Sequence, residues 1–135
     1  MALNGNSFAA KLHELEDEYR LLRLRIQQAQ RLDSAKLRQA LTSVLADCRK
    51  TSQSLARSVK EGRSPAVAAL SGVQLDYMKR MEELLQKELP EDLHGKNHTE
   101  AIDHAEAAAL YAEYAMDFAT LSMRQALAAA LAALL

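Results

Sequence analysis

Apolar residues recur at alternating steps of four and three along most of the chain, which is the spacing of one face of an α-helix. Phe8, Leu12 and Leu15 begin the first such series, and the same spacing returns after each short polar interval. The pattern predicts four helices. They are expected over residues 7–31, about 34–61, about 65–89 and about 99–135.

Residues that end and begin helices lie between these periodic stretches. The sequence Gly62-Arg63-Ser64-Pro65 places a glycine at a helix end and a proline at the next helix start. A turn near Asp33 is preferred between the first two helices, although one unbroken helix remains an alternative. Pro90–His98 is predicted to be the longest loop. The expected N-caps are Ser7, then Asp33 or Ser34, then Ser64, then Asn97 or Thr99.

Composition also favours helices. Hydrophobic residues make up 49% of the 135-residue chain, but aromatic residues only 4%, and tryptophan is absent. Only four glycines and two prolines are present, which leaves little turn chemistry for a sheet protein. We therefore predict an all-α fold in one domain over residues 1–135. Short connections favour a four-helix antiparallel up-and-down bundle.

The fourth predicted helix carries a long seam of small residues at heptad spacing. A seam of methyl groups lets another backbone approach closely, so Ala112 and Ala119 are expected to be nearly fully buried against another helix. The larger side chains flank this seam. The seam residues are Ala101, Ala105, Ala108, Ala112, Ala115, Ala119, Ser122, Ala126, Ala129 and Ala133.

The last turns of this helix, residues 127–135, contain only alanine and leucine. A helix over residues 99–135 is about 55 Å long, whereas the first three are about 36–42 Å each. An uncovered overhang of this composition is an apolar patch that needs a partner. We therefore predict a homodimer or a higher homo-oligomer. Its expected interface residues are Ala112, Ala119, Ala126, Leu127, Leu131 and Leu134.

The net charge of −1 conceals an uneven distribution. Residues 20–63 hold eleven basic and three acidic side chains, and residues 64–117 hold four basic and eleven acidic ones. Complementarity within the bundle or between protomers explains this pattern best. Nucleic-acid binding by the basic segment is the less favoured alternative, because the segment lacks aromatic residues for base stacking.

Candidate chemistry is sparse. His94, His98 and His104 cluster near acidic residues, and Asp103, Glu106, Glu113 and Asp117 share one helix stripe. The stripe is expected to face solvent, and the histidines to form an ordinary polar loop. Cys48 is expected to be a packed, reduced thiol. We predict no catalytic residue, metal site or cofactor.

The resulting functional hypothesis is a non-enzymatic scaffold or protein-interaction module. The main alternative is a metal-carboxylate enzyme that uses the acidic stripe or the His94–His104 cluster. No signal peptide is visible, and no apolar stretch is long enough to span a bilayer. A cytoplasmic location without membrane contact is the expectation.

Overall fold

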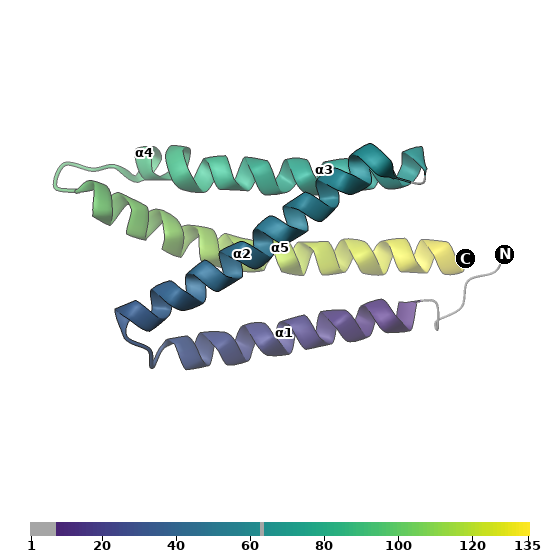
Figure 1. Cartoon of the computed structure of the whole chain (residues 1–135), viewed down its shortest axis with the longest axis horizontal. Coiled ribbons are helices and arrows are strands. Elements are labelled where there is room, and N and C mark those ends of the chain that lie inside the picture. The colour runs from purple at the N-terminus through teal and green to yellow at the C-terminus, as the bar shows by residue number, and fades with distance from the viewer. Residues whose placement is uncertain (1–7, 63) are drawn as a thin grey trace. The chain divides into compact units, whose positions relative to one another are not determined.

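The computed structural model describes residues 8–62 and 64–135, and these residues form helices joined by short turns (Figure 1). The structure is 90% helical, with no strand among the described residues. The all-α prediction is confirmed. The elements are α1 (Ala9–Ala29), α2 (Ser34–Glu61), α3 (Pro65–Glu83), the π-helical segment η2 (Leu84–Glu88), α4 (Leu89–Leu93) and α5 (Glu100–Leu134).

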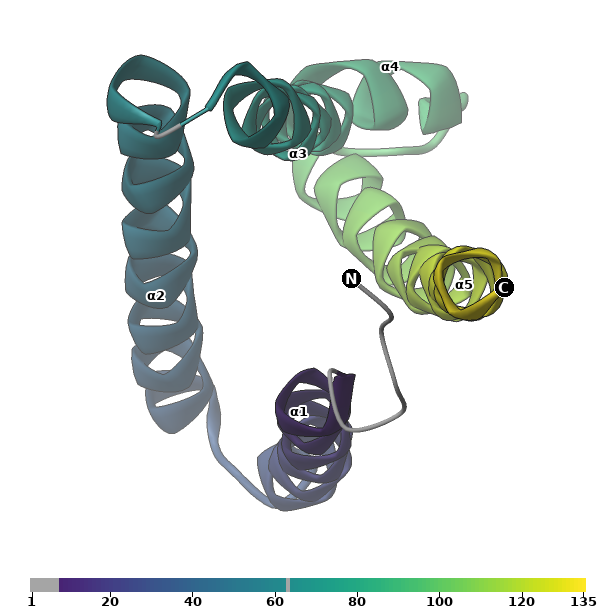
Figure 2. The same cartoon turned by 90° about the vertical axis from the view of Figure 1, so that its right-hand side faces the viewer.

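Capping side chains fix the helix starts that the sequence predicts. Asp33 Oδ1 accepts the Lys36 backbone N–H at 2.9 Å, and α1 and α2 are two separate helices (Figure 2). Ser64 Oγ accepts the Val67 N–H at 3.2 Å, directly before the proline that opens α3. Thr99 caps α5 in the same way. The predicted N-cap Ser7 lies outside the described residues.

The prediction of a loop over Pro90–His98 is wrong in its first half, because the helix continues through Pro90 to Leu93. A proline inside an α-helix lacks one N–H, and its ring clashes with the carbonyl four residues earlier. Here the backbone widens just before the proline: the Leu89 N–H bonds to the Leu84 carbonyl, five residues back. A wider turn of this kind relieves the crowding at the proline ring. The helix therefore continues with a hydrogen bond that spans five residues instead of four, and it does not end here.

One arginine spans this widened turn from the outside. The Arg80 guanidinium donates to both carboxylate oxygens of Glu88, and it also lies 3.7 Å from Glu83. The hydrogen bond and charge of Glu88 raise the pKa of Arg80. A two-pronged contact of this type fixes the relative position of both groups better than a single bond does.

Backbone contacts divide the chain into two compact units. The central unit is Leu45–Thr120, and the terminal unit consists of the described part of Met1–Val44 together with Leu121–Leu135. The prediction of one domain concerns how these units associate, and it stays a prediction. No described helix is both long enough and apolar enough to cross a membrane.

The central unit has a small core between α2, α3 and α5. The rings of Tyr77 and Phe118 meet edge to face, with their centroids 5.9 Å apart. The Ser52 hydroxyl donates to the Met78 sulfur at 3.8 Å, which joins α2 to α3. Burial raises the pKa of the Tyr111 phenol, and the nearby Tyr77 and Cys48 raise it further. All buried residues among the described ones lie in this unit: Ser71, Pro90, Asp103 and Ala107.

Gly72 lies inside a helix, and the sequence alone predicts that a neighbouring helix such as the alanine seam approaches closely there. The neighbour in the structure is α2: a Cβ built at Gly72 meets the Val59 Cγ2 methyl at 3.9 Å and nothing closer. This is an ordinary van der Waals separation, so no close backbone approach requires glycine at this position.

The terminal unit contains no buried residue among its described positions. The large apolar side chains of α1 are 39–58% exposed, and Leu127 and Leu131 of α5 are 61% and 57% exposed. Its helices are set by local capping and propensity, with little burial between them.

Candidate functional site

The most organised polar region of the chain is the connection between α4 and α5. His94 leaves α4 with an extended backbone, and the His98 N–H bonds to the Gly95 carbonyl at 3.0 Å to close a turn. The His98 ring lies over Gly95, since a Cβ built there is 3.4 Å from the ring. Thr99 then caps α5, and this sequence of turn and cap places Asp103 one helical turn into α5, below both histidines.

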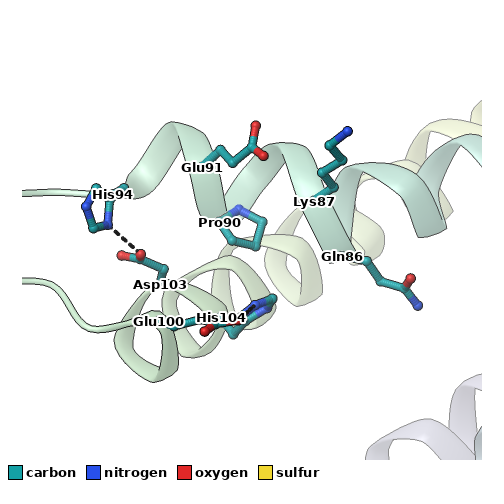
Figure 3. Close-up of a pocket in the computed structure, with 8 residues that line it drawn as sticks. All are labelled: Gln86, Lys87, Pro90, Glu91, His94, Glu100, Asp103 and His104. Atoms are coloured by element: carbon teal, nitrogen blue, oxygen red, sulfur yellow. Dashed lines mark hydrogen bonds and ion pairs between the residues drawn. The ribbon is translucent and has the colours of Figure 1, made fainter.

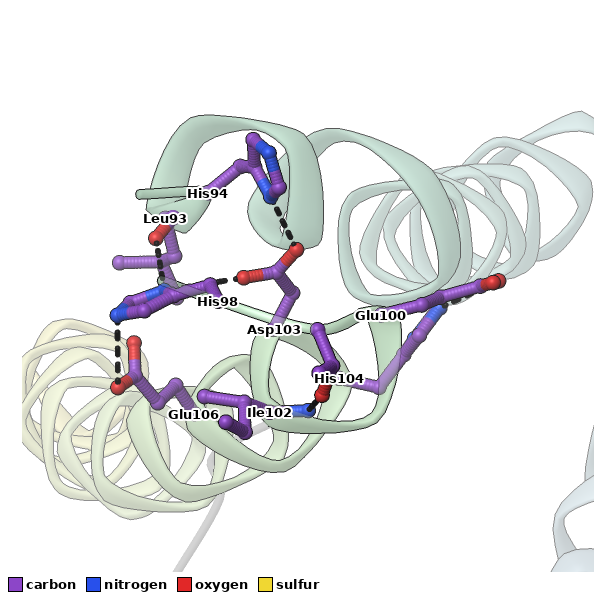
Figure 4. A network of polar contacts seen from close by, with 9 residues as sticks. Leu93, His94, His98, Glu100, Ile102, Asp103, His104 and Glu106 are labelled. Atoms are coloured by element: carbon purple, nitrogen blue, oxygen red, sulfur yellow. Dashed lines mark hydrogen bonds and ion pairs between the residues drawn. The ribbon is translucent and has the colours of Figure 1, made fainter. Parts of the chain in front are cut away.

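Asp103 accepts a hydrogen bond from each of these two histidines (Figure 4). His94 Nδ1 lies 2.7 Å from Oδ2, and His98 Nδ1 lies 3.1 Å from Oδ1. The aspartate side chain is only 8% exposed, so almost all its polar surface is taken up by these contacts. A carboxylate can only accept, and therefore both imidazoles carry their proton on Nδ1.

Two effects act on the pKa of Asp103 in opposite directions. Burial raises it, and the hydrogen bonds and charges of His94 and His98 lower it more strongly, so the net pKa lies below the ordinary aspartate value. Asp103 is therefore ionised at neutral pH. An ionised acceptor makes stronger hydrogen bonds than a neutral one, which holds both rings in place.

His98 also makes contacts beyond Asp103. Its Nδ1 lies 3.1 Å from the backbone carbonyl of Leu93, which is the last residue of α4. Its Nε2 lies 3.9 Å from Glu106 Oε1 on α5. His98 thus joins the end of α4 to the first two turns of α5. We call His94, His98, Asp103 and Glu106 the histidine latch.

An open cavity of about 380 Å³ lies beside the latch (Figure 3). His94 and Asp103 belong to its wall, and His104 lies 3.8 Å from Glu100 on α5. Its lining carries both charge signs and it is wide open to solvent, whereas small-molecule sites are mainly enclosed. The lining residues are Gln86, Lys87, Pro90, Glu91, His94, Glu100, Asp103 and His104.

The latch has the residue types of a metal site but a different geometry. Among the described residues, no three His, Cys, Asp or Glu side chains are grouped so that they could hold a metal ion. Both imidazoles direct Nδ1 to the same carboxylate, and His98 Nε2 faces Glu106 (Figure 4). This arrangement uses the histidines as hydrogen-bond donors to a buried acid, which is a structural role in joining α4 to α5.

The expectation that the acidic stripe of α5 faces solvent is therefore wrong for Asp103. The reason is the continuation of the helix through Pro90, which brings the end of α4 over the first turns of α5. Leu110, on the same stripe, is half-buried, and Glu106 is half-exposed beside His98. The sequence shows the signal, His94 and His98 four residues apart before a capping threonine and Asp103, but the expectation of an ordinary polar loop does not include their joint contact with Asp103.

In the central unit, α5 packs through a face next to the alanine seam. Ala107 is fully buried and Tyr111 is half-buried, whereas Ala112 and Ala119 are exposed. Within a single chain, Ala112 and Ala119 are therefore not buried against another helix as expected. The packed face also contains two larger rings: Phe118 meets Tyr77 of α3, and Tyr111 lies near Tyr77 and Cys48. Ala126, Leu127, Leu131 and Leu134 are exposed as well.

The uneven charge distribution gives no ion pair between the basic residues of α2 and the acidic residues of α3 or α5 among the described residues of the central unit. Arg49, Lys50, Arg57 and Lys60 project from α2, and none of them pairs with a described acidic side chain of α3 or α5 in that unit. The ion pairs there join neighbours on α3 and η2, or belong to the latch and the start of α5. Cys48 is a free thiol and is exposed.

Comparison with known proteins gives no assignment: no family model, no curated protein and no solved structure matches this chain.

Proposed function

We propose that this chain is a non-enzymatic scaffold or protein-interaction module that associates with further copies of itself through α5. The observation that supports it is the uncovered apolar surface of that helix, where the interface residues expected from the sequence are exposed. They are Ala112, Ala119, Ala126, Leu127, Leu131 and Leu134. Contiguous apolar surface of this kind is typical of protein contacts.

The composition of the last turns strengthens the proposal. Residues 127–135 have no polar side chain at all, so every side of the helix is apolar there. A helix that is apolar on all sides is stable in water only when other elements surround it. Association of two chains supplies those elements, and the product is a homodimer or a higher homo-oligomer.

The same association completes the antiparallel up-and-down bundle that the sequence favours. The four long helices are present, and the apolar stripes of α1, α2 and α5 are exposed in the terminal unit. Stripes with heptad spacing pack against one another in bundles with short connections. The scaffold is therefore an assembled bundle whose outer faces carry the charged residues.

Sedimentation equilibrium of the wild-type chain and of Leu131→Glu tests the proposal. The wild type is expected to sediment above the 14.9 kDa of one chain, and the variant is expected to associate more weakly because it places a charge in the contact. Gln125→Glu adds the same charge at an exposed polar position of the same helix and should leave the mass unchanged. A monomeric wild type at high concentration contradicts self-association, and an unaffected Leu131→Glu oligomer removes α5 from the interface.

A second candidate function rests on the unpaired basic residues of α2. Arg49, Lys50 and Arg57 are without an acidic partner in the central unit and are therefore available to phosphate groups. A salt-series gel shift distinguishes this function. Phosphate contacts give an affinity that falls steeply with salt, with a slope of about −0.7 to −0.9 for each phosphate neutralised. Weak binding that vanishes at about 0.15 M salt leaves the scaffold as the only proposal.

A further inference from the structure

Helix α1 carries a complete and uncovered coiled-coil face. Its apolar stripe occupies the two core positions of successive heptads, and every large member is exposed by 39% or more. Leu12, Leu15, Tyr19, Leu22 and Ile26 form the centre of this stripe. The stripe covers about three heptads, which is the shortest length at which such a pattern specifies a coiled coil.

The charged residues beside this stripe change sign halfway along α1. On one flank Glu16 is followed one heptad later by Arg23, and on the other flank Glu18 is followed by Arg25. Flanking positions of this kind choose the partner and the orientation of a coiled coil, because they meet across the interface. Two copies of the same helix can therefore satisfy all four charges.

These flanking charges are unpaired within α1. Its ion pairs join Lys11 to Glu14 at 3.4 Å and His13 to Asp17 at 3.5 Å. None of these residues is one of the four flanking charges just named. The Arg23 guanidinium lies over the Tyr19 ring at 5.9 Å from its centroid, so its charged end remains beside the stripe. The four flanking side chains thus hold no ion pair within α1 that a partner would have to break.

We propose that α1 pairs with α1 of a second copy as an antiparallel two-stranded coiled coil. With Tyr19 opposite Leu22 of the second copy, Leu15 lies opposite Ile26, and the stripes are fully matched. Glu16 then meets Arg23 of the other chain, and Glu18 meets Arg25. Each contact occurs twice, because the pairing is two-fold symmetric.

The overall charge of α1 selects the antiparallel direction. Residues 9–18 contain four acidic side chains and one lysine, and residues 19–29 contain three arginines and no acid. A parallel pair places the acidic halves side by side, and likewise the basic halves. An antiparallel pair places each acidic half beside a basic half, which lowers the electrostatic energy.

This contact is separate from the proposed association through α5. The two proposals have the same partner, a second copy of the chain, but use different helices. Neither set of residues overlaps the other. Variants of α1 and the Leu131→Glu variant therefore report on two different surfaces, and either proposal can fail while the other survives.

Charge reversal in the full-length chain tests the pairing. Glu16→Arg combined with Glu18→Arg, and separately Arg23→Glu combined with Arg25→Glu, should each weaken self-association roughly tenfold or more, because attractive flanks become repulsive. An equimolar mixture of the two should recover wild-type association as a heteromer. Circular dichroism checks that each variant stays helical.

The matched control is Glu14→Arg combined with Asp17→Arg, which makes the same change of net charge on the outer side of α1. This control should associate like the wild type. Equal weakening in the control and in the flank variants overturns the proposal, since the effect then follows net charge alone. Failure of the mixture to recover association overturns it as well.

Disulfide trapping tests the direction. In a Cys48→Ser background, Ala9→Cys chains are mixed with Gln30→Cys chains and oxidised gently. Antiparallel pairing places positions 9 and 30 of different chains on the same flank, within reach of a disulfide, and the mixed dimer should predominate. Failure of the mixed dimer to predominate over the two like-with-like dimers overturns the antiparallel proposal.

Discussion

The central and terminal units are both helical, yet among the described residues only the central unit has buried side chains. Within the central unit, a few polar residues form specific hydrogen bonds between helices and connections. The main example is Asp103, which accepts hydrogen bonds from His94 and His98. The terminal unit has exposed apolar stripes, and the polar contacts among its described residues are all local, within one helix or its cap. Heptad patterning therefore specifies which surface of a helix packs, whereas polar contacts specify the neighbour within the chain.

The largest expected difference between the units is in amide hydrogen exchange. Amides of α1 are expected to exchange orders of magnitude faster than those of residues 103–111 in a dilute sample, because few buried contacts oppose local opening. Raising the protein concentration should slow exchange in α1 and change that of residues 103–111 much less, since these residues lie outside both proposed interfaces. Exchange followed by mass spectrometry at two concentrations measures this. Equal protection of both units at low concentration contradicts the comparison.

Replacing an alanine of α5 with leucine should have a smaller effect on stability, and the effect depends on which face of the helix carries the alanine. Ala107→Leu is expected to destabilise the protein by about 1–3 kcal/mol, because Ala107 is fully buried and the leucine overpacks its site. Ala112→Leu has the same change of volume at an exposed seam position. It should be harmless to the isolated chain and disruptive only where a second copy covers the seam. Thermal melts at low and high concentration separate the two cases.

A pH series probes the latch. The folded-state pKa of Asp103 is lowered, so its ionisation stabilises the fold above the ordinary aspartate value of 3.8, and this contribution is lost as the pH falls through the folded pKa. The wild type should therefore melt at a higher temperature than Asp103→Asn near neutral pH, and the two should converge in acid below about 3.8. A difference that persists unchanged into strong acid rules out the carboxylate as its source.

Glycine replacements in the central unit should give the smallest effect. Gly72→Ala is expected to stabilise the protein by about 0.5–1 kcal/mol, because alanine favours the helix and its Cβ meets only the Val59 methyl. Gly62→Ala is the contrasting variant, since a Cβ there would lie 2.3 Å from the Ser58 carbonyl oxygen. Denaturant melts should show opposite signs for the two. A destabilised Gly72→Ala would mean that α2 and α3 approach more closely than the structure shows.

Sequence patterns predict the local parts of this fold well. Asp33, Ser64 and Thr99 cap their helices as expected, because a cap depends only on residues within one turn. The helix through Pro90 is missed because it depends on the widened turn at Leu84–Glu88, and the burial of Asp103 is missed because it depends on contacts between α5 and the end of α4. The packed face of α5 is missed for a related reason. A row of alanines shows where a close partner fits, but rings such as Phe118 determine which neighbour is reached first.

The widened turn at Leu84–Glu88 has a consequence for how the length of this region can vary. Successive residues of a helix are rotated by about 100°, so the loss of one residue turns everything beyond it by that angle. Deleting Gln86 would restore regular α-helical spacing, but it would also rotate α4 and carry His94 away from Asp103. The segment between Arg80 and Pro90 therefore tolerates substitutions on its outer side more readily than any insertion or deletion. Natural variants of this chain are expected to differ in length elsewhere.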